Sequence, residues 1–339
     1  MRRLIGAIAA VLALCGLFVT AEAAAPQGTL EKIRVHSPAL EGNLQGNEAT
    51  RDVWVYLPPG YGKGRQRYPV VYFLHGYAVT ADVYVDSVLK IPASTDAAMA
   101  AGARHAIIVM PDAFTRFGGS FYSSSPTIGD WERWIARDMV AYVDSHYRTI
   151  ARPGGRGLSG HSMGGYGTLR IGMKYPEVFG ALYAMSSAVG LSAPSAEVSK
   201  AQHARMAEGI KTEARSFVNS VQSQASAWAP NTQNPPYYFD LPFDADGKVV
   251  PGVAERWPAN SPKVMVDQYV PALKGYRGLM LDVGNEDGLQ AGNAEFVATL
   301  TRLGIAHQYE VYEGNHGNRV GARFISHVLP FFARHLDTK

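Results

Sequence analysis

The stretch Gly160-His161-Ser162-Met163-Gly164-Gly165 decides the fold of this chain, because it places a serine between glycines where an apolar run gives way to a helical pattern. A G-x-S-x-G pattern is typical of a nucleophile elbow, a sharp strand-to-helix turn that presents a serine hydroxyl above a sheet. Glycine has no Cβ, so Gly160 and Gly164 let strand and helix approach closely. Pro176 marks the end of the helix that follows. We therefore predict a strand, a turn at Ser162 and a helix.

Short apolar runs on both sides of this motif predict the other strands. They lie at residues 53–57, 69–74, 106–110, 181–185, 279–283 and 307–312. Helical patterns lie at residues 131–147, after the motif, at 293–303 and at 320–336, the last with a kink expected at Pro330. A run that is apolar throughout, such as 69–74, is typical of a strand buried on both faces. The alternation predicts an α/β fold, with a mostly parallel central sheet and helices on both faces.

The segment from 190 to about 274 interrupts this alternation with a polar helical stretch and then Pro-rich and aromatic-rich sequence. A segment of this length between two strands is usually a lid or an insert that shapes the substrate site. A separate domain is the alternative, but the segment lacks a core pattern of its own. We expect one catalytic domain over 26–339, with 190–274 as a cap over one side of the serine cleft. Large rings in the insert either line that cleft or only pack the insert against the body: Trp228, Tyr237, Tyr238, Phe239, Phe243 and Trp257.

The first 25 residues have the pattern of a secretory signal peptide. Arg2 and Arg3 form a basic start, residues 4–19 are apolar, and Ala21-Glu22-Ala23 is a small-x-small cleavage pattern. Cys15 is the only cysteine, so the mature chain is predicted to have none, which excludes disulfides, zinc–thiolate sites and thiol catalysis. We expect a secreted or periplasmic protein that makes no membrane contact after the signal is removed.

Composition and charge exclude further classes of function. The chain has 339 residues, of which 47% are hydrophobic and 18% charged, as in one generous globular domain. Removal of the signal peptide changes the net charge from +3 to +2, too little for a nucleic-acid interface, and no Lys/Arg cluster appears. The D-x-D-G string at 244–247 lacks the ligands and the final Glu of a calcium loop. We therefore predict no nucleic-acid partner, no metal and no cofactor.

Two residue types must join the serine before it can react, because a hydroxyl is a weak nucleophile until a histidine takes its proton and a carboxylate orients that histidine. The chain offers both after Ser162, in the order serine, acid, histidine. His316, in a loop after the last predicted strand, is the strongest base. Asp287 is the preferred acid, because it lies past a strand end where a loop can carry it toward His316. Glu286, one residue away, stays open as the acid, whereas Asp282 is still within the strand and is expected to point into packing.

The negative charge that develops during acyl transfer needs backbone donors. One expected donor is the Met163 N–H, at the positive end of the elbow helix. The loop after the 69–74 strand reads His75-Gly76-Tyr77, where the glycine permits an unusual turn and the Tyr77 N–H is the natural second donor. A simple strand-ending turn is the alternative there. His161 neighbours the serine, but an elbow directs adjacent side chains apart.

With these motifs in this order, the chain resembles the "Putative esterase" (esterase D-like) family of α/β-hydrolases over residues 53–336. That family includes S-formylglutathione hydrolases, the feruloyl and acetylxylan esterases of carbohydrate esterase family 1, and mycobacterial mycolyltransferases. The most specific pieces lie at 159–167, 175–180 and 285–287. By position, the resemblance implies these roles: Ser162 as nucleophile, Asp287 as acid, His316 as base, and Tyr77 and Met163 as the oxyanion amides. The signal peptide departs from the cytosolic S-formylglutathione hydrolases, and the insert varies among subfamilies, so the substrate does not transfer.

The sequence thus predicts a serine carboxylesterase that acylates Ser162, releases an alcohol and hydrolyses the acyl-enzyme with water activated by His316. Its expected partner is a small-molecule or carbohydrate-linked ester. An acyltransferase would use the same site, because the sequence does not separate water from an alcohol as the acceptor. A non-catalytic binding protein of the same fold would show erosion of the three residues, and none is visible.

Overall fold

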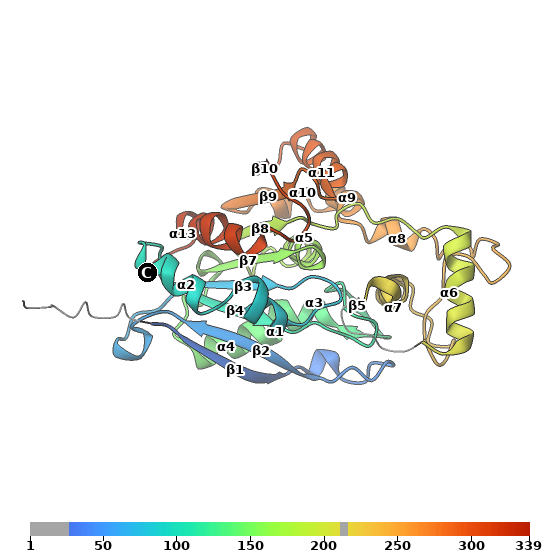
Figure 1. Cartoon of the computed structure of the whole chain (residues 1–339), viewed down its shortest axis with the longest axis horizontal. Helices are drawn as coiled ribbons and strands as arrows, with labels where there is room; N and C mark the ends of the chain where they lie inside the picture. The colour runs from blue at the N-terminus through green and yellow to red at the C-terminus, as the bar shows by residue number, and fades with distance from the viewer. Residues whose placement is uncertain (1–26, 211–215) are drawn as a thin grey trace, which may run out of the picture.

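The computed structural model describes residues 27–210 and 216–339, so the predicted signal peptide lies outside the described residues. Its core is a sheet with the strand order β1-β2-β4-β3-β7-β8-β9-β10 (Figure 1). β1 and β4 pair antiparallel with β2, and every later pair in this order is parallel. The strands are β1 Thr29–His36, β2 Thr50–Leu57, β3 Val70–Leu74, β4 Ile107–Pro111, β7 Arg156–His161, β8 Ala181–Met185, β9 Gly278–Gly284 and β10 Gln308–Tyr312; β5 Ser124–Ser125 and β6 Gly129–Asp130 form a separate short hairpin.

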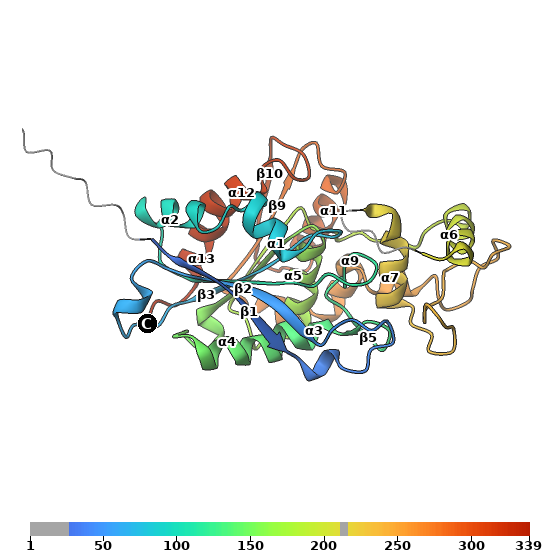
Figure 2. The same cartoon turned by 60° about the horizontal axis from the view of Figure 1, so that its bottom comes forward.

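Helices cover both faces of the sheet, because its central strands bury apolar side chains on both sides. Along β3, Val70, Tyr72 and Leu74 belong to one buried cluster, and Val71 and Phe73 belong to the other. The first cluster includes the side chains of α3 Trp131–Arg133, α4 Val140–His146, α5 Met163–Lys174 and α11 Gln290–Arg302. The second includes those of α2 Ala93–Ala100, α12 Val320–Arg323 and α13 Leu329–His335, as Figure 2 shows for the opposite sides taken by α2 and α4.

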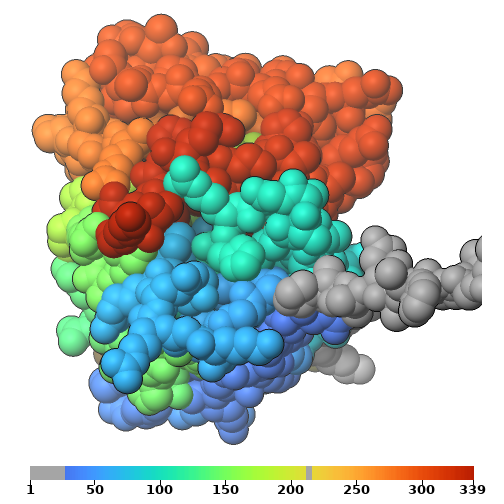
Figure 3. All heavy atoms as spheres, turned by 90° about the vertical axis from the view of Figure 1, so that its left-hand side faces the viewer, coloured from blue at the N-terminus to red at the C-terminus, as the bar shows by residue number. Residues whose placement is uncertain are grey.

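Three π-helical turns extend these helices. One follows the short α1, Ala81–Val83, and spans Tyr84–Val88. The others join α3 to α4 at Trp134–Met139 and α12 to α13 at Phe324–Val328. The last helix packs beside the segment of α2 on the face seen in Figure 3, where both are exposed at the surface.

The predicted α/β-hydrolase architecture is confirmed, and the differences lie at its margins. β1 was not predicted: it forms the edge of the sheet, and exposed or half-buried side chains fill all but one of its positions. In the last helix the irregularity is the π-helical turn at Phe324–Val328, just before the expected kink at Pro330. Within the described residues, no helix is both long and apolar enough to cross a membrane.

The insert contains short helices connected by long irregular segments, and α6 lies farthest from the sheet (Figure 1). Its helices are α6 Ala196–Glu208, α7 Ser220–Trp228, α8 Arg256–Ala259, α9 Pro262–Met265 and α10 Val270–Lys274. Trp228 packs edge-on against Phe121 and Trp257, and its Nε1–H donates to Ser123 Oγ at 3.1 Å. Phe239 and Trp257 are fully buried. The interpretation that these rings line the serine cleft is therefore wrong for Trp228, Phe239 and Trp257. Trp228 and Phe239 pack against Phe121 and Phe117 of the body, and Trp257 packs within the insert against Trp228.

Candidate active site

The predicted elbow is present between the end of β7 and the start of α5. Ser162 has φ 60° and ψ −116°, a backbone conformation that residues other than glycine rarely adopt, so the surrounding structure must hold the serine there. A Cβ on Gly160 would overlap the Gly164 carbonyl, and a Cβ on Gly164 would overlap the carbonyl of Leu74 on the neighbouring strand. Both glycines are therefore required by close backbone contact, and the turn displays Ser162 at the carboxyl end of the parallel strands.

Ser162, His316 and Asp287 form one line of hydrogen bonds, although 154 residues separate the serine from the histidine. An ionised carboxylate only accepts hydrogen bonds, so His316 Nδ1–H donates to Asp287 Oδ2, at 2.8 Å. His316 Nε2 is then free to accept from the Ser162 hydroxyl, at 2.9 Å. This geometry lets the imidazole take the serine proton without moving.

The environment of Asp287 keeps its carboxylate charged. Burial alone would raise its pKa, since the side chain is 1% exposed. Hydrogen bonds from His316, from the Leu289 N–H at 2.9 Å and from Ser186 outweigh burial, so the pKa lies below the ordinary value. A charged carboxylate beside Nδ1 fixes the tautomer of His316 and stabilises the imidazolium that forms when the histidine accepts a proton.

The other two candidate acids do not contact His316. Glu286 is exposed, and its backbone N–H donates to the Gly314 carbonyl at 2.9 Å. Asp282 is buried in β9, with Arg323 Nε at 2.6 Å and the Tyr183 hydroxyl at 2.7 Å. Burial raises the pKa of Asp282 despite the guanidinium beside it. Of the three carboxylates that the sequence offered, the structure brings Asp287 to the histidine.

His75 orients the peptide between Gly76 and Tyr77. Its Nε2 accepts from the Ala113 N–H at 2.8 Å, so Nδ1 carries the proton and donates to the Gly76 carbonyl at 2.8 Å. Burial lowers the pKa of His75, which keeps this neutral tautomer. A trans peptide is planar, so the Tyr77 N–H points to the side opposite the Gly76 carbonyl. A Cβ on Gly76 would lie 3.5 Å from the Ser162 Cβ, which places this peptide beside the serine.

The two amides predicted to bind the oxyanion have no acceptor within residues 27–210 and 216–339: the Tyr77 N–H and the Met163 N–H are both unpaired there. Met163 opens α5, so its N–H lies at the positive end of the helix dipole. The Tyr77 ring is held by its hydroxyl, which donates to the Phe117 carbonyl at 2.6 Å, and by stacking on Phe121. The arrangement leaves two fixed donors beside Ser162.

A cleft of about 290 Å³ opens onto Ser162 and His316. Apolar side chains form its walls: Val79, Val83, Val88, Val320 and Phe217. Phe217 comes from the insert, is 67% exposed and contacts the Tyr77 ring. This side chain was not predicted, because a single ring in a polar stretch carries no pattern. Tyr84 and the contacts of His161 were not predicted either, and both residues line the cleft.

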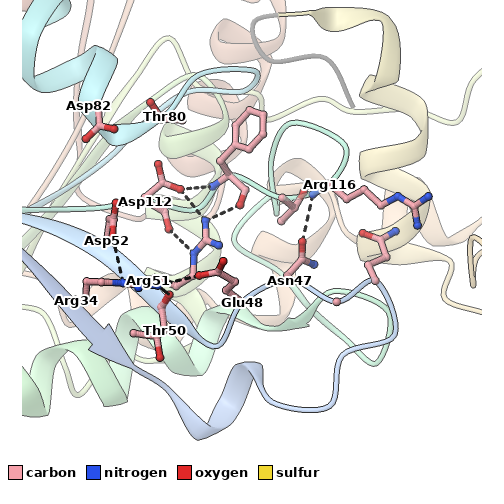
Figure 4. Close-up of a pocket in the computed structure, with 14 residues that line it drawn as sticks. Arg34, Asn47, Glu48, Thr50, Arg51, Asp52, Thr80, Asp82, Asp112 and Arg116 are labelled. Atoms are coloured by element: carbon pink, nitrogen blue, oxygen red, sulfur yellow. Dashed lines mark hydrogen bonds and ion pairs between the residues drawn. The ribbon is translucent and has the colours of Figure 1, made fainter. Parts of the chain in front are cut away.

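A larger cavity, of about 710 Å³, has Thr80 and Asp82 in its lining (Figure 4), next in the chain to Val79 and Val83 of the cleft. Its walls are polar and charged, and Arg51 and Asp112 form an ion pair of 2.8 Å there. We call it the polar groove. Among the described residues, no group of three or more His, Cys, Asp or Glu side chains is placed to hold a metal ion.

Comparison with known proteins places the chain among esterases. An esterase of Mycobacterium tuberculosis is 32% identical over 126 residues, which span 36% of this chain and 25% of that protein. An endo-1,4-beta-xylanase/feruloyl esterase of Xylanibacter ruminicola is 34% identical over 136 residues, 37% of this chain and 18% of that protein. The matched part is thus about a quarter or less of each curated relative.

The fold is similar to that of a ferulic acid esterase, with a TM-score of 0.67 and 20% identity over 92% of this chain and all of that chain. The family model described as "Putative esterase" matches residues 46–328. That match covers most of the chain and agrees with the elbow and the sheet order, and the chain therefore belongs to the "Putative esterase" family of α/β-hydrolases.

Proposed function

We propose that the protein is a serine carboxylesterase, and that Ser162, His316 and Asp287 are its catalytic triad. The observation that carries this proposal is the continuous hydrogen-bond line from Ser162 Oγ through His316 to Asp287, on a serine held at positive φ. A serine with a purely structural role would not need a strained backbone next to a histidine. A nucleophilic serine benefits from both, because the turn exposes its hydroxyl and the histidine is a base that takes its proton.

The proposed reaction has two halves. His316 Nε2 takes the proton of Ser162 as its Oγ attacks the ester carbonyl, and the Tyr77 and Met163 N–H groups bind the resulting oxyanion. His316 then gives this proton to the departing alcohol, which leaves an acyl group on Ser162. Water then attacks the carbonyl carbon of that acyl group while His316 takes a proton from the water. His316 passes this proton to Ser162 Oγ as the carboxylic acid is released.

The acyl group of the substrate is proposed to lie in the apolar cleft. The valines and Phe217 offer apolar contact and no unpaired charge, which suits an aliphatic or aryl acyl chain rather than a charged one. A relative of 34% identity carries feruloyl esterase in its name, so aryl esters belong in the test. The alcohol part is proposed to be a small molecule or a carbohydrate.

Export and domain organisation form part of the same proposal. The basic start, the apolar run and the cleavage pattern within residues 1–25 favour secretion to the periplasm or the medium. Residues 26–339 would then form the mature catalytic domain, with 190–274 as its insert. Sequencing the N-terminus of the protein recovered after export tests this: a start near residue 24 supports it, and an intact Met1 contradicts it.

The deciding experiment measures hydrolysis of a panel of esters that vary in acyl length and aromaticity. Ser162→Ala should lose activity on every ester, by as much as about 10⁶-fold, while keeping the fold. Ser159→Ala is the matched control, because Ser159 lies in the same elbow strand and its buried hydroxyl has no partner among the described residues. Full activity in purified Ser162→Ala would overturn the proposal. Adding an alcohol and analysing the products separates hydrolysis from acyl transfer.

A further inference from the structure

A second histidine, His161, touches the backbone of the proposed base. Its side chain is buried, and its ring centroid lies 4.7 Å from that of His316. One ring nitrogen, Nε2, is 2.7 Å from the His316 carbonyl oxygen, and the other, Nδ1, is 2.6 Å from the Tyr84 hydroxyl. The triad uses none of these groups.

The direction of these hydrogen bonds follows from their chemistry. A carbonyl oxygen only accepts, so His161 Nε2 carries the proton and donates to His316. Nδ1 is then an acceptor, and the Tyr84 hydroxyl donates a hydrogen bond to it. Burial, and next the neighbouring His316, lower the pKa of His161 to about 3, so it stays neutral and this direction holds.

The Tyr84 hydroxyl also contacts the loop that carries the proposed oxyanion donor. A Cβ on Gly76 would lie 2.7 Å from this hydroxyl oxygen, so the hydroxyl packs directly against the Gly76 backbone. Tyr84 is itself buried, in the π-helical turn after α1, so its hydroxyl cannot turn to solvent. One hydroxyl therefore touches both the Gly76 backbone and, through His161, the His316 backbone.

Resting on the proposed function, we propose that Tyr84 and His161 are positioning residues. They hold two loops at a fixed separation across Ser162: the loop that carries His316, called the base loop, and the loop at residues 75–77, called the oxyanion loop. We call this pair the Tyr84–His161 link. Both side chains line the cleft, but among the described residues neither forms a hydrogen bond with the Ser162 hydroxyl, and the link acts through the backbones of Gly76 and His316.

The base loop has reason to need such a support. The His316 side chain is 39% exposed, and Asp287 anchors its ring at Nδ1 alone. The contact from His161 to the His316 carbonyl fixes a second point of the same residue. With both points held, Nε2 of the ring is directed at the Ser162 hydroxyl before substrate arrives. A displacement of about 1 Å at a reacting group can cost about 10²-fold in rate, so a small shift of this loop is sufficient to lower kcat.

The first test removes the Tyr84 hydroxyl and keeps its ring, with an ester that Ser162→Ala fails to hydrolyse. Tyr84→Phe should lower kcat by about 10- to 100-fold, with KM changed less than about threefold. Tyr276→Phe is the matched control, since it also removes a tyrosine hydroxyl bond, to the Gly172 carbonyl at 2.7 Å, outside the cleft. A kcat for Tyr84→Phe equal to that of the control would overturn the inference and leave the proposed function intact.

The second test asks whether the two residues act as one unit. If they do, Tyr84→Phe combined with His161→Ala should be no slower than His161→Ala alone, because the link is already broken. His161→Gln keeps an amide that can donate to the His316 carbonyl, so it should recover part of the kcat lost in His161→Ala. Losses that multiply in the double variant, or a glutamine variant as slow as the alanine variant, would contradict the link.

Discussion

The cleft at Ser162 and the polar groove show that neither size nor charge marks the candidate active site. The groove has a volume of about 710 Å³, more than twice that of the cleft. Of the charged side chains that line the two regions, most line the groove. Most of its charges are paired, as Arg51 is with Asp112 (Figure 4). Asp52 and Asp82 both pair with Lys32, which lies outside the lining of the groove. The cleft is smaller and apolar, but there a serine, a histidine and a carboxylate are aligned. Alignment, rather than charge, prepares a group to react.

The two regions share one wall. Tyr77 to Val79 and Val83 line the cleft, whereas Thr80 and Asp82 line the groove. Asp112 accepts from the Ala81 N–H at 3.0 Å, so the groove holds this wall through a backbone contact. We expect changes at the cleft to alter turnover and changes in the groove to act weakly, unless they release this wall.

The largest expected effect distinguishes three carboxylates, one in β9 and two in the loop that follows it. Asp287→Asn should lower kcat by about 10⁴-fold, because an amide neither stabilises the imidazolium nor holds the same tautomer. Asp282→Asn should mainly lower the free energy of unfolding, since that carboxylate pairs with Arg323 in the core. Glu286→Gln should remain close to wild type. Steady-state kinetics on the three purified variants check this, and a larger loss for Glu286→Gln than for Asp287→Asn would move the acid by one residue.

The next effect distinguishes a ring in the cleft from a ring in the core. Trp228→Ala should lower the free energy of unfolding by about 3–5 kcal/mol and slow all esters alike, because its ring is packed against Phe121 and Trp257. Phe217→Ala should leave stability nearly unchanged, since the ring is 67% exposed. It should instead change kcat/KM unequally across the ester panel, by about tenfold for each 1.4 kcal/mol of lost contact. Uniform losses in Phe217→Ala would remove that ring from substrate binding.

Acid should destabilise the protein through histidines at the cleft. The pKa of His161 falls to about 3 in the folded chain from 6.5, so between these values the unfolded chain binds a proton that the folded chain does not. Stability is then lost as pH falls below about 6.5, by up to about 1.4 kcal/mol per pH unit. Burial also lowers the pKa of His75, so this residue likewise makes stability fall as pH falls. Urea unfolding from pH 6.5 to 4.5 measures this slope, and His161→Gln should flatten it. An equally steep slope in that variant would show that His161 is not its source.

The smallest effect is expected in the groove. Glu48 is exposed and pairs with Arg34 at 2.8 Å, and surface pairs of this kind contribute about 0–1 kcal/mol. Glu48→Gln should change kcat/KM on small esters by less than about twofold and leave thermal unfolding nearly unchanged. A tenfold loss of kcat/KM on a small ester would mean that the groove takes part in turnover, and would end the distinction between the two regions.

Much of the fold could be predicted because the local signals agreed with the final structure. β8 begins and ends at the predicted residues, β3 differs from the prediction by one residue at its start, and β9 extends one residue further at each end, since each is an apolar run with few alternatives. The edge strand β1 escaped, because its alternation of exposed and half-buried positions is weak. The rings of the insert were ambiguous, since an aromatic residue has the same one-letter pattern whether it packs in a core or lines a cleft.

The candidate site was predictable where chain order carries information. Ser162 lies in a motif, and Asp287 and His316 follow it in the chain order that is typical of the α/β-hydrolase fold. The choice between Asp287 and Glu286 depended on a loop conformation that no local rule fixes. Tyr84, in the π-helical turn after α1, lies 77 positions from His161 in the sequence, so their contact depends on tertiary structure. His161 is part of the motif, but the sequence does not show which groups it contacts.

The proposed function requires that the geometry around Ser162 makes this one hydroxyl reactive. An organophosphorus ester is a sharp probe of that reactivity, because it reacts with an activated serine and stays bound. Peptide mass spectrometry should find one adduct per chain, on Ser162, and His316→Gln should slow its formation by orders of magnitude. An adduct on another residue, or labelling of Ser162 at an unchanged rate without His316, would contradict the proposed role of Ser162.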